Sequence, residues 1–82
     1  MSAILISSRY DWEGLFVNGK LVYQNHEIDR RRLQYICKQY KLDFTKIKQG
    51  TVTEEYDEYL YNAGGFDENL EEVKYELDDD YE

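Results

Sequence analysis

Residues 14–23, GLFVNGKLVY, decide the fold of the N-terminal half of this 82-residue chain. Two apolar stretches, 15–17 and 21–23, flank the tripeptide Asn18-Gly19-Lys20. Asn-Gly is the preferred dipeptide of a type I′ turn, because both central positions need a positive φ and the twist of that turn matches the twist of paired strands. The stretch therefore predicts a β-hairpin with its turn at Asn18 and Gly19.

Two further segments can extend the hairpin into a sheet. Residues 3–8 are rich in β-branched side chains and are expected to add a third strand. Residues 44–53, FTKIKQGTVT, alternate loosely between apolar and polar side chains. They predict a strand or an extended link, with a turn or bulge at Gly50.

An amphipathic helix is expected at about residues 29–41. Its apolar face has the helical spacing i, i+3, i+4, i+7 and consists of Leu33, Ile36, Cys37 and Tyr40. Asp29 can cap the start of the helix, and Lys38 and Lys41 suit the negative C-terminal end of the helix dipole. Ile28 is expected to pack the entry of the helix against the hairpin.

A second, acidic helix is expected near residues 54–62. The tetrapeptide Thr51-Val52-Thr53-Glu54 fits a capping box, in which a hydroxyl and a glutamate satisfy each other's free N–H groups. Gly64 and Gly65 are suited to end this helix.

Residues 66–77 fit two patterns. Phe66, Leu70, Val73 and Leu77 have helical spacing, whereas Val73, Tyr75 and Leu77 alternate as they would in a strand. We favour the helix, with Asp67 as its N-cap, because the glutamates that follow suit the positive end of a helix dipole.

Together these elements predict one α+β domain over residues 1–82. A small antiparallel sheet built on the hairpin packs on one amphipathic helix, and an acidic, helical C-terminal segment follows. Leu, Ile, Val and Phe supply 20 of the 82 residues, about 24%, whereas disorder is typical below roughly 20%. A folded chain is therefore expected, with residues 78–82 as a frayed tail.

Charge is divided unevenly along the chain. Residues 1–53 hold nine Lys or Arg and five Asp or Glu, a balance of +4, whereas residues 54–82 hold one and thirteen, a balance of −12. The two balances sum to the net charge of −8. Such a division indicates charged partners and says little about a reaction.

No catalytic, cofactor or metal signature accompanies these charges, so a non-enzymatic protein without cofactors is expected. A catalytic Ser-His or Cys-His arrangement would depend on His26, the only histidine. No spacing places it beside a candidate nucleophile, which would be Ser7, Ser8 or Cys37. Cys37 is expected to be a buried, inert thiol. The carboxylates lack the alternating ligand positions of a Ca²⁺-binding loop.

Cysteine content and apolar runs predict the compartment. A single cysteine cannot form an intramolecular disulfide, and the opening SAILISSRYDW lacks the basic and apolar regions of an export signal. No apolar run approaches the roughly 20 residues of a membrane span. A cytoplasmic protein that makes no membrane contact is expected.

The basic residues gather on and after the first predicted helix: Arg30, Arg31, Arg32, Lys38, Lys41, Lys46 and Lys48. Three interpretations are open. The basic face docks on the protein's own acidic segment, within one chain or between copies; it is a solvated face; or Arg30, Arg31 and Arg32 contact nucleic-acid phosphates. The negative net charge opposes the last of these, because it reduces the counterion release that drives such binding.

The acidic segment that begins at residue 54 is interleaved with tyrosines. It can be a solvated face over a core of tyrosines, or a partly disordered solubilising tail. A sharper interpretation is a nucleic-acid mimic, in which carboxylates stand in for phosphates and tyrosines supply rigid contact area. The candidate partner-binding residues are the carboxylates Glu54, Glu55, Asp57, Glu58, Asp67, Glu68, Glu71 and Glu72 and the tyrosines Tyr56, Tyr59 and Tyr61.

We therefore expect an interaction protein that covers a basic surface of a partner, such as a nucleic-acid-binding protein. Its small size and segregated charge are features that this chain shares with phage-encoded inhibitors that imitate DNA and with immunity proteins that cover nucleases. The comparison is one of general type and rests on no shared motif. One alternative is a weak nucleic-acid binder that uses Arg30, Arg31 and Arg32 and is autoinhibited by the acidic segment; tight DNA binding is not expected. Another is a structural or assembly protein whose opposite charge halves pair between copies to form an oligomer.

Overall fold

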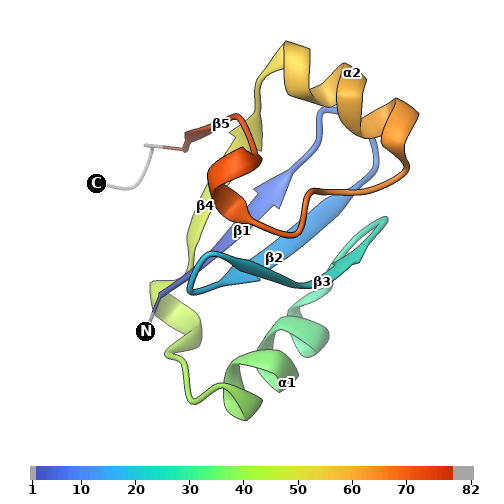
Figure 1. Cartoon of the computed structure of the whole chain (residues 1–82). Helices are drawn as coiled ribbons and strands as arrows, with labels where there is room; N and C mark the ends of the chain where they lie inside the picture. Colours follow the sequence, from blue (N-terminus) through green and yellow to red (C-terminus); the bar gives the residue numbers. More distant parts are fainter. Residues whose placement is uncertain (1, 79–82) are drawn as a thin grey trace.

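The computed structural model describes residues 2–78 and shows a small α+β fold with one sheet and two α-helices (Figure 1). The predicted frayed tail, 78–82, lies outside these residues apart from Asp78. In chain order the elements are β1 (Ala3–Ser7), β2 (Glu13–Val17), β3 (Lys20–Asn25), α1 (Arg30–Gln39), the 3₁₀ turn η1 (Phe44–Lys46), β4 (Lys48–Val52), α2 (Glu54–Ala63), the 3₁₀ turn η2 (Leu70–Glu72) and β5 (Tyr75–Leu77).

The sheet has five strands in the order β3-β2-β1-β4-β5. The predicted third strand is confirmed as β1, which lies at the centre of the sheet. β1 pairs with β4 in parallel, whereas all other pairs are antiparallel. The expected antiparallel sheet was therefore wrong and the sheet is mixed. A parallel pair needs a long crossover connection, and β2, β3 and α1 together supply it between β1 and β4.

The predicted hairpin is confirmed. Asn18 and Gly19 have φ of 53° and 82°, so both central residues of the turn are left-handed. The expected bulge at Gly50 is wrong, because Gly50 pairs in regular register with Ile6 and Leu77. The irregularity lies instead in the hairpin, where the β2–β3 register shifts between Leu15 and Phe16.

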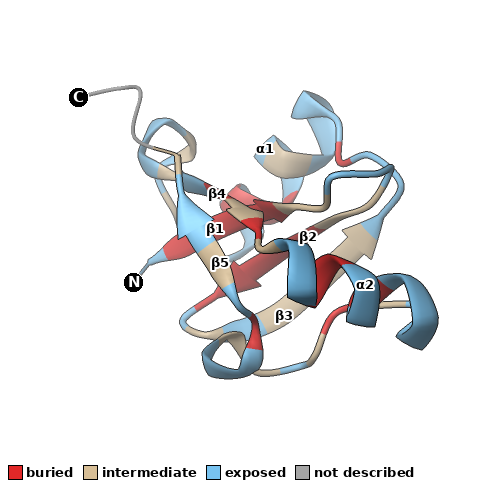
Figure 2. Cartoon of the chain, turned by 90° about the horizontal axis from the view of Figure 1, so that it is seen from above, coloured by how far each residue is buried: buried red, intermediate tan, exposed pale blue. Residues whose placement is uncertain are grey.

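Both faces of the sheet are covered, which gives three layers (Figure 2). Ile4 and Ile6 of β1 pack with α2 and the C-terminal segment, in a cluster that also includes Phe16, Val52, Tyr56, Leu60, Phe66 and Val73. Ala3 and Leu5 face the other way and pack with α1, in a cluster that also includes Leu15, Val17, Ile28 and Ile36. The alternation of side chains along a strand divides one short apolar run between two cores.

The predicted amphipathic helix is confirmed as α1. It is the α-helix that covers the face of the sheet carrying Ala3 and Leu5. Asp29 caps its start, because Oδ1 accepts a hydrogen bond from the Arg32 N–H at 2.8 Å. Ile36, Cys37 and the preceding Ile28 are buried as predicted. Tyr40 is exposed, so the apolar face is shorter than its spacing indicated.

The second predicted helix is confirmed as α2, with a different cap. Thr53 is the N-cap, whereas Thr51 belongs to β4. Gly64 ends the helix in the left-handed conformation, with φ of 82°, and its N–H donates to the Leu60 carbonyl. A non-glycine residue would be strained there, which explains the helix end.

The helix favoured for residues 66–77 was wrong. This segment forms a loop, η2 and the edge strand β5, which pairs antiparallel with β4. Phe66 and Val73 still enter the core cluster beneath α2. Pairing with β5 satisfies the backbone N–H and C=O groups along the outer edge of β4. A helix at residues 66–77 would have left these groups unpaired.

No helix within residues 2–78 is long and apolar enough to cross a membrane.

We predict that Gly19→Val lowers the free energy of unfolding by about 1 kcal/mol or more, because a β-branched residue is strained at a positive φ. Gly19→Asn is the matched control, since asparagine tolerates the left-handed region, and it should lose clearly less. Urea denaturation of the three proteins measures both effects. Equal losses in the two variants would contradict a left-handed turn.

We predict that Ile36→Asp and Gln34→Asp differ sharply in stability. Ile36 is buried against the sheet, so a carboxylate there would lack a partner and cost roughly 3 kcal/mol or more. Gln34 is exposed, and its replacement should cost well under about 1 kcal/mol. Thermal and urea unfolding compare the two, and similar losses would place the core on another face of α1.

Candidate interaction site

Helix α2 presents an acidic outer face. Its N-terminus is capped by Thr53, whose hydroxyl accepts a hydrogen bond from the Tyr56 N–H at 3.2 Å. Glu54 and Glu55 lie in the first turn and Glu58 follows one turn later, and all three are exposed. The positive end of the helix dipole stabilises carboxylates there. No Lys or Arg within residues 2–78 forms an ion pair with them, so their charge faces solvent.

Two of the three candidate tyrosines are available on α2. Tyr59 and Tyr61 are 47% and 80% exposed. Tyr56 is turned inward, where its ring packs in the core with Phe66 at a centroid distance of 6.2 Å. Tyr56 therefore stabilises the fold, and the contact area that α2 offers to a partner comes from the other two.

The carboxylate of Asp67 fastens the C-terminal loop to α2. It accepts hydrogen bonds from the hydroxyls of Tyr56 at 2.9 Å and Tyr59 at 3.2 Å. The Asp67 N–H donates to the Tyr56 oxygen at 3.0 Å. Burial and the nearby carboxylate raise the pKa of Tyr56, and hydrogen bonding to Asp67 raises the pKa of Tyr59. Asp67 is therefore occupied inside the protein and is neither an N-cap nor a free surface charge.

Asp57 is also turned inward, although it was a candidate surface charge. It is 4% exposed. Its carboxylate accepts hydrogen bonds from the Ser8 hydroxyl at 2.9 Å and from the Arg9 N–H at 3.2 Å. Both donors lie in the β1–β2 loop, so Asp57 ties this loop to α2.

The remaining candidate carboxylates are exposed but do not form one patch. Glu72 lines a shallow hollow together with Glu55, Tyr59 and Lys74. Glu71 lies beside the hairpin turn, where Lys20 and Asn69 are hydrogen-bonded. Glu68 lies next to that contact, and its carbonyl accepts the Leu21 N–H. Only Glu72 extends the acidic face of α2 among these three.

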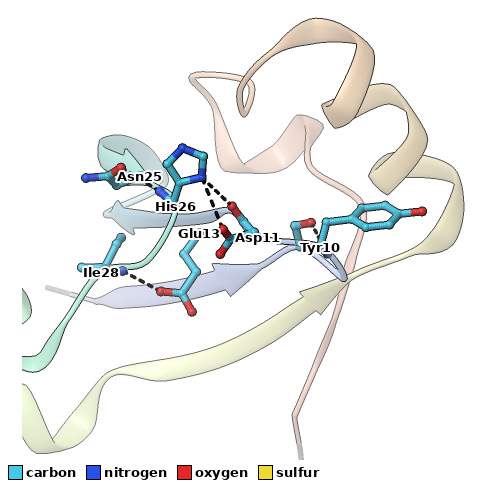
Figure 3. A network of polar contacts seen from close by, with 7 residues as sticks. Tyr10, Asp11, Glu13, Asn25, His26 and Ile28 are labelled. Atoms are coloured by element: carbon cyan, nitrogen blue, oxygen red, sulfur yellow. Dashed lines mark hydrogen bonds and ion pairs between the residues drawn. The ribbon is translucent and has the colours of Figure 1, made fainter.

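The β1–β2 loop builds a polar network at one end of the sheet (Figure 3). His26 Nδ1 lies 3.3 Å from the Asp11 carbonyl oxygen and 3.5 Å from its carboxylate. Glu13 accepts the Ile28 N–H at 2.8 Å, which fixes the chain before α1. In the figure the His26 ring is turned toward Asp11, whereas the Tyr10 ring points away from it.

An aromatic pocket of about 320 Å³ lies between this loop and α2. Trp12 forms one wall: its Nε1–H donates to the Gln24 Oε1 at 2.9 Å, and its ring meets His26 edge-on at 5.0 Å. The rings of Tyr10 and Tyr61 lie at a centroid distance of 6.4 Å and are tilted by 52° to each other. The full lining is Ser8, Tyr10, Asp11, Trp12, His26, Asp57, Leu60, Tyr61, Gly64 and Gly65.

The sequence did not identify the aromatic pocket. Tyr10 and Trp12 carry no known motif, and they contact α2 across some fifty positions of sequence that no local pattern connects. One signal was available: Tyr56, Asp57 and Leu60 share one helical face, so Asp57 could have been assigned to the inner side of α2.

The basic helix and the acidic helix lie on opposite faces of the sheet (Figures 1 and 2). Arg30 lies over the Phe44 ring at 5.4 Å, and Arg32 lies over the Tyr23 ring at 5.1 Å. Within residues 2–78 no ion pair joins a Lys or Arg to an Asp or Glu. The basic face therefore does not dock on the acidic segment of the same chain.

Within residues 2–78 no hydrogen bond joins His26 to a possible nucleophile. Ser8 lines the same pocket but donates to Asp57. Cys37 is buried on the opposite side of the sheet, where burial, followed by the Asp43 charge, raises the pKa of its thiol. In the described part of the chain no three His, Cys, Asp or Glu side chains are grouped as metal ligands.

We predict that Tyr56→Phe lowers the free energy of unfolding by about 1 kcal/mol near pH 7, because the Asp67 N–H and carboxylate lose their buried partner. The pKa of Tyr56 is raised above its ordinary value of 10.0, so the folded state holds this proton more tightly than the unfolded state. This contribution is complete below about pH 9, one unit under the ordinary tyrosine pKa, and falls as the pH rises further.

The variant should therefore lose less stability than the unmodified protein between pH 9.5 and about pH 11, a range set by the ordinary tyrosine pKa. Urea denaturation across this range measures the difference. Tyr61→Phe, at an exposed ring, is the matched control and should leave the pH profile unchanged. Identical profiles for Tyr56→Phe and the unmodified protein would contradict the buried hydroxyl pair.

Comparisons of the chain with protein-family models, curated proteins and solved structures found no match.

Proposed function

We propose that this protein is a non-enzymatic interaction protein that uses the outer face of α2 to cover a basic surface of a partner protein. One observation carries the proposal: Glu54, Glu55 and Glu58 are exposed and unpaired within the described part of the chain, beside the exposed rings of Tyr59 and Tyr61. We call these five residues the acidic face.

Electrostatics favours a basic partner. The chain carries a net charge of −8, and its basic helix lies on the opposite side of the sheet from the acidic face. Arg9 lines a hollow together with Glu54 and Glu58, but no ion pair within the described residues neutralises the acidic face. A field of this sign speeds association with positive surfaces and disfavours acidic partners.

Tyrosines beside carboxylates supply the contact area. Aromatic rings bury a large surface at a low cost in side-chain entropy, and tyrosine is enriched among residues that dominate interface energies. Tyr59 is held by its hydrogen bond to Asp67, so it is already ordered before a partner arrives. Tyr56, Asp57 and Asp67 support this surface from beneath.

A nucleic-acid-binding protein is the partner class that we favour. Carboxylates spaced along α2 resemble a row of phosphates to a groove built for nucleic acid, and the mechanism would be occlusion of that groove. We place this interaction in the cytoplasm, where the single cysteine stays reduced.

We predict that Glu54→Lys/Glu58→Lys abolishes partner binding while the fold is retained, as judged by circular dichroism. The matched control is Glu27→Lys/Glu76→Lys, which changes the net charge equally at two exposed sites away from the acidic face. Affinity capture followed by interferometry with the captured partner compares the three proteins. Binding of the unmodified chain should also weaken steeply toward 0.15 M salt, where screening acts over about 8 Å.

Three results would contradict the proposal. Equal loss in the test and control variants would show a dependence on net charge without a specific face. Tight retention of duplex DNA by the intact protein, lost on replacing Arg30, Arg31 and Arg32, would favour a nucleic-acid-binding α1. Salt-sensitive oligomers of the purified chain, seen by light scattering, would favour pairing of the α1 and α2 faces between copies.

A further inference from the structure

We infer that the aromatic pocket receives an arginine side chain of the basic partner. This inference rests on the proposed function and adds a specific anchor to it. Three features of the pocket support it: a buried carboxylate that forms no ion pair within residues 2–78, walls made of aromatic rings, and continuity with the acidic face.

The carboxylate is that of Asp57. It is more than nine-tenths buried and lines the pocket, yet its two hydrogen bonds come from uncharged donors, the Ser8 hydroxyl and the Arg9 backbone N–H. Within residues 2–78 it forms no ion pair with a Lys or Arg. A buried charge is costly when it has no opposite charge beside it. A cation entering the pocket would remove this cost.

The walls suit a planar cation. Trp12, Tyr10 and Tyr61 all line the pocket. Trp12 is held in place by its hydrogen bond to Gln24 and its edge contact with His26. Cations are attracted to the faces of aromatic rings, most strongly to tryptophan. A guanidinium can stack on a ring and bind a carboxylate with its fork of N–H groups, which an ammonium cannot do as well.

The size of the pocket fits one side chain. Its volume of about 320 Å³ lies at the small end of the roughly 300–1,000 Å³ that ligand pockets span. Most of its lining is apolar or aromatic, which suits the methylene stem of arginine as well as its head.

The pocket opens beside the acidic face. A second hollow shares Tyr10, Asp57 and Tyr61 with it and adds Glu54 and Glu58. Arg9 is the one Lys or Arg that lines either hollow, and it forms no ion pair within the described residues. An incoming arginine would thus cross the field of the α2 carboxylates before it reached the pocket.

The pocket carries its own reporter, because Trp12 is the only tryptophan of the chain. We would titrate the full chain with N-acetyl-arginine methylamide at constant ionic strength and follow the fluorescence of Trp12. The lysine and citrulline analogues are the two comparison probes; citrulline keeps the shape of arginine and lacks its charge. The arginine probe should give a saturable change, the lysine probe a weaker one and the citrulline probe none.

Two substitutions test the walls and the carboxylate. Tyr61→Leu, at a ring that is 80% exposed, should weaken binding of the arginine probe by roughly threefold to tenfold. Tyr35→Leu, at an exposed ring of α1, is the matched control and should leave binding unchanged. Asp57→Asn should weaken binding by about tenfold or more, because the charge-assisted hydrogen bonds are lost. Equal responses to arginine and citrulline, no response to either, or equal responses to arginine and lysine would overturn the inference.

Failure of this inference can be told apart from failure of the proposed function. If Glu54→Lys/Glu58→Lys abolishes partner binding while the arginine probe gives no saturable change, only the anchor is wrong. If the probe binds and Tyr61→Leu weakens it, but the charge reversals leave partner binding intact, the pocket is correct and the acidic face is not.

Discussion

The whole fold depends on the burial of β1 on both faces. Its four residues from Ala3 to Ile6 are all apolar and buried, and they point alternately to the two sides of the sheet. A central strand of this kind has to be covered twice, because a half-covered sheet would leave one of its apolar rows in water. One helix on each side meets this requirement: α1 covers Ala3 and Leu5, and α2 covers Ile4 and Ile6.

The same constraint separates the charges. α1 carries a cluster of basic residues and α2 a cluster of acidic ones, so covering both faces places these two clusters on opposite sides of the sheet. They cannot neutralise each other within one chain. The separation of these two clusters along the sequence is thereby preserved in space.

Features that depend on local sequence patterns were predicted correctly. Features that depend on contacts between residues far apart in the sequence were not. The Asn18-Gly19 turn, the Asp29 cap and the buried positions Ile36 and Cys37 of α1 each depend on neighbours within a few positions, and each was predicted. The parallel pairing of β1 with β4 joins residues more than forty positions apart, for example Ile4 and Lys48, and no local signal encodes it. The prediction for residues 66–77 was wrong for a related reason. Their apolar spacing suits a helix, but pairing with the free edge of β4 makes residues 75–77 a strand. In the site, three of the four candidate carboxylates on α2 are exposed, Glu54, Glu55 and Glu58, whereas Asp57, which was named with them, is buried. The pocket was missed because it forms between the β1–β2 loop and α2, which are far apart in the sequence. The hydrogen bonds that join them all end on Asp57.

The chemistry of Asp57 connects stability with recognition. Asp57 joins the β1–β2 loop to α2, so its side chain has to accept one hydrogen bond from the Ser8 hydroxyl and a second from the Arg9 N–H. The Ser8 hydroxyl donates to one carboxylate oxygen and the Arg9 N–H to the other, so in a neutral amide the NH₂ group would face one of these donors, whereas a carboxylate presents an acceptor to each. A carboxylate therefore joins the loop to α2 better than an amide would, but it also leaves a buried negative charge, and the desolvation of that charge opposes folding. That cost falls when a cation enters beside it, since binding to the folded state alone stabilises that state. The residue that fixes the β1–β2 loop in the free protein is therefore also the residue that makes the adjoining pocket selective for positive charge.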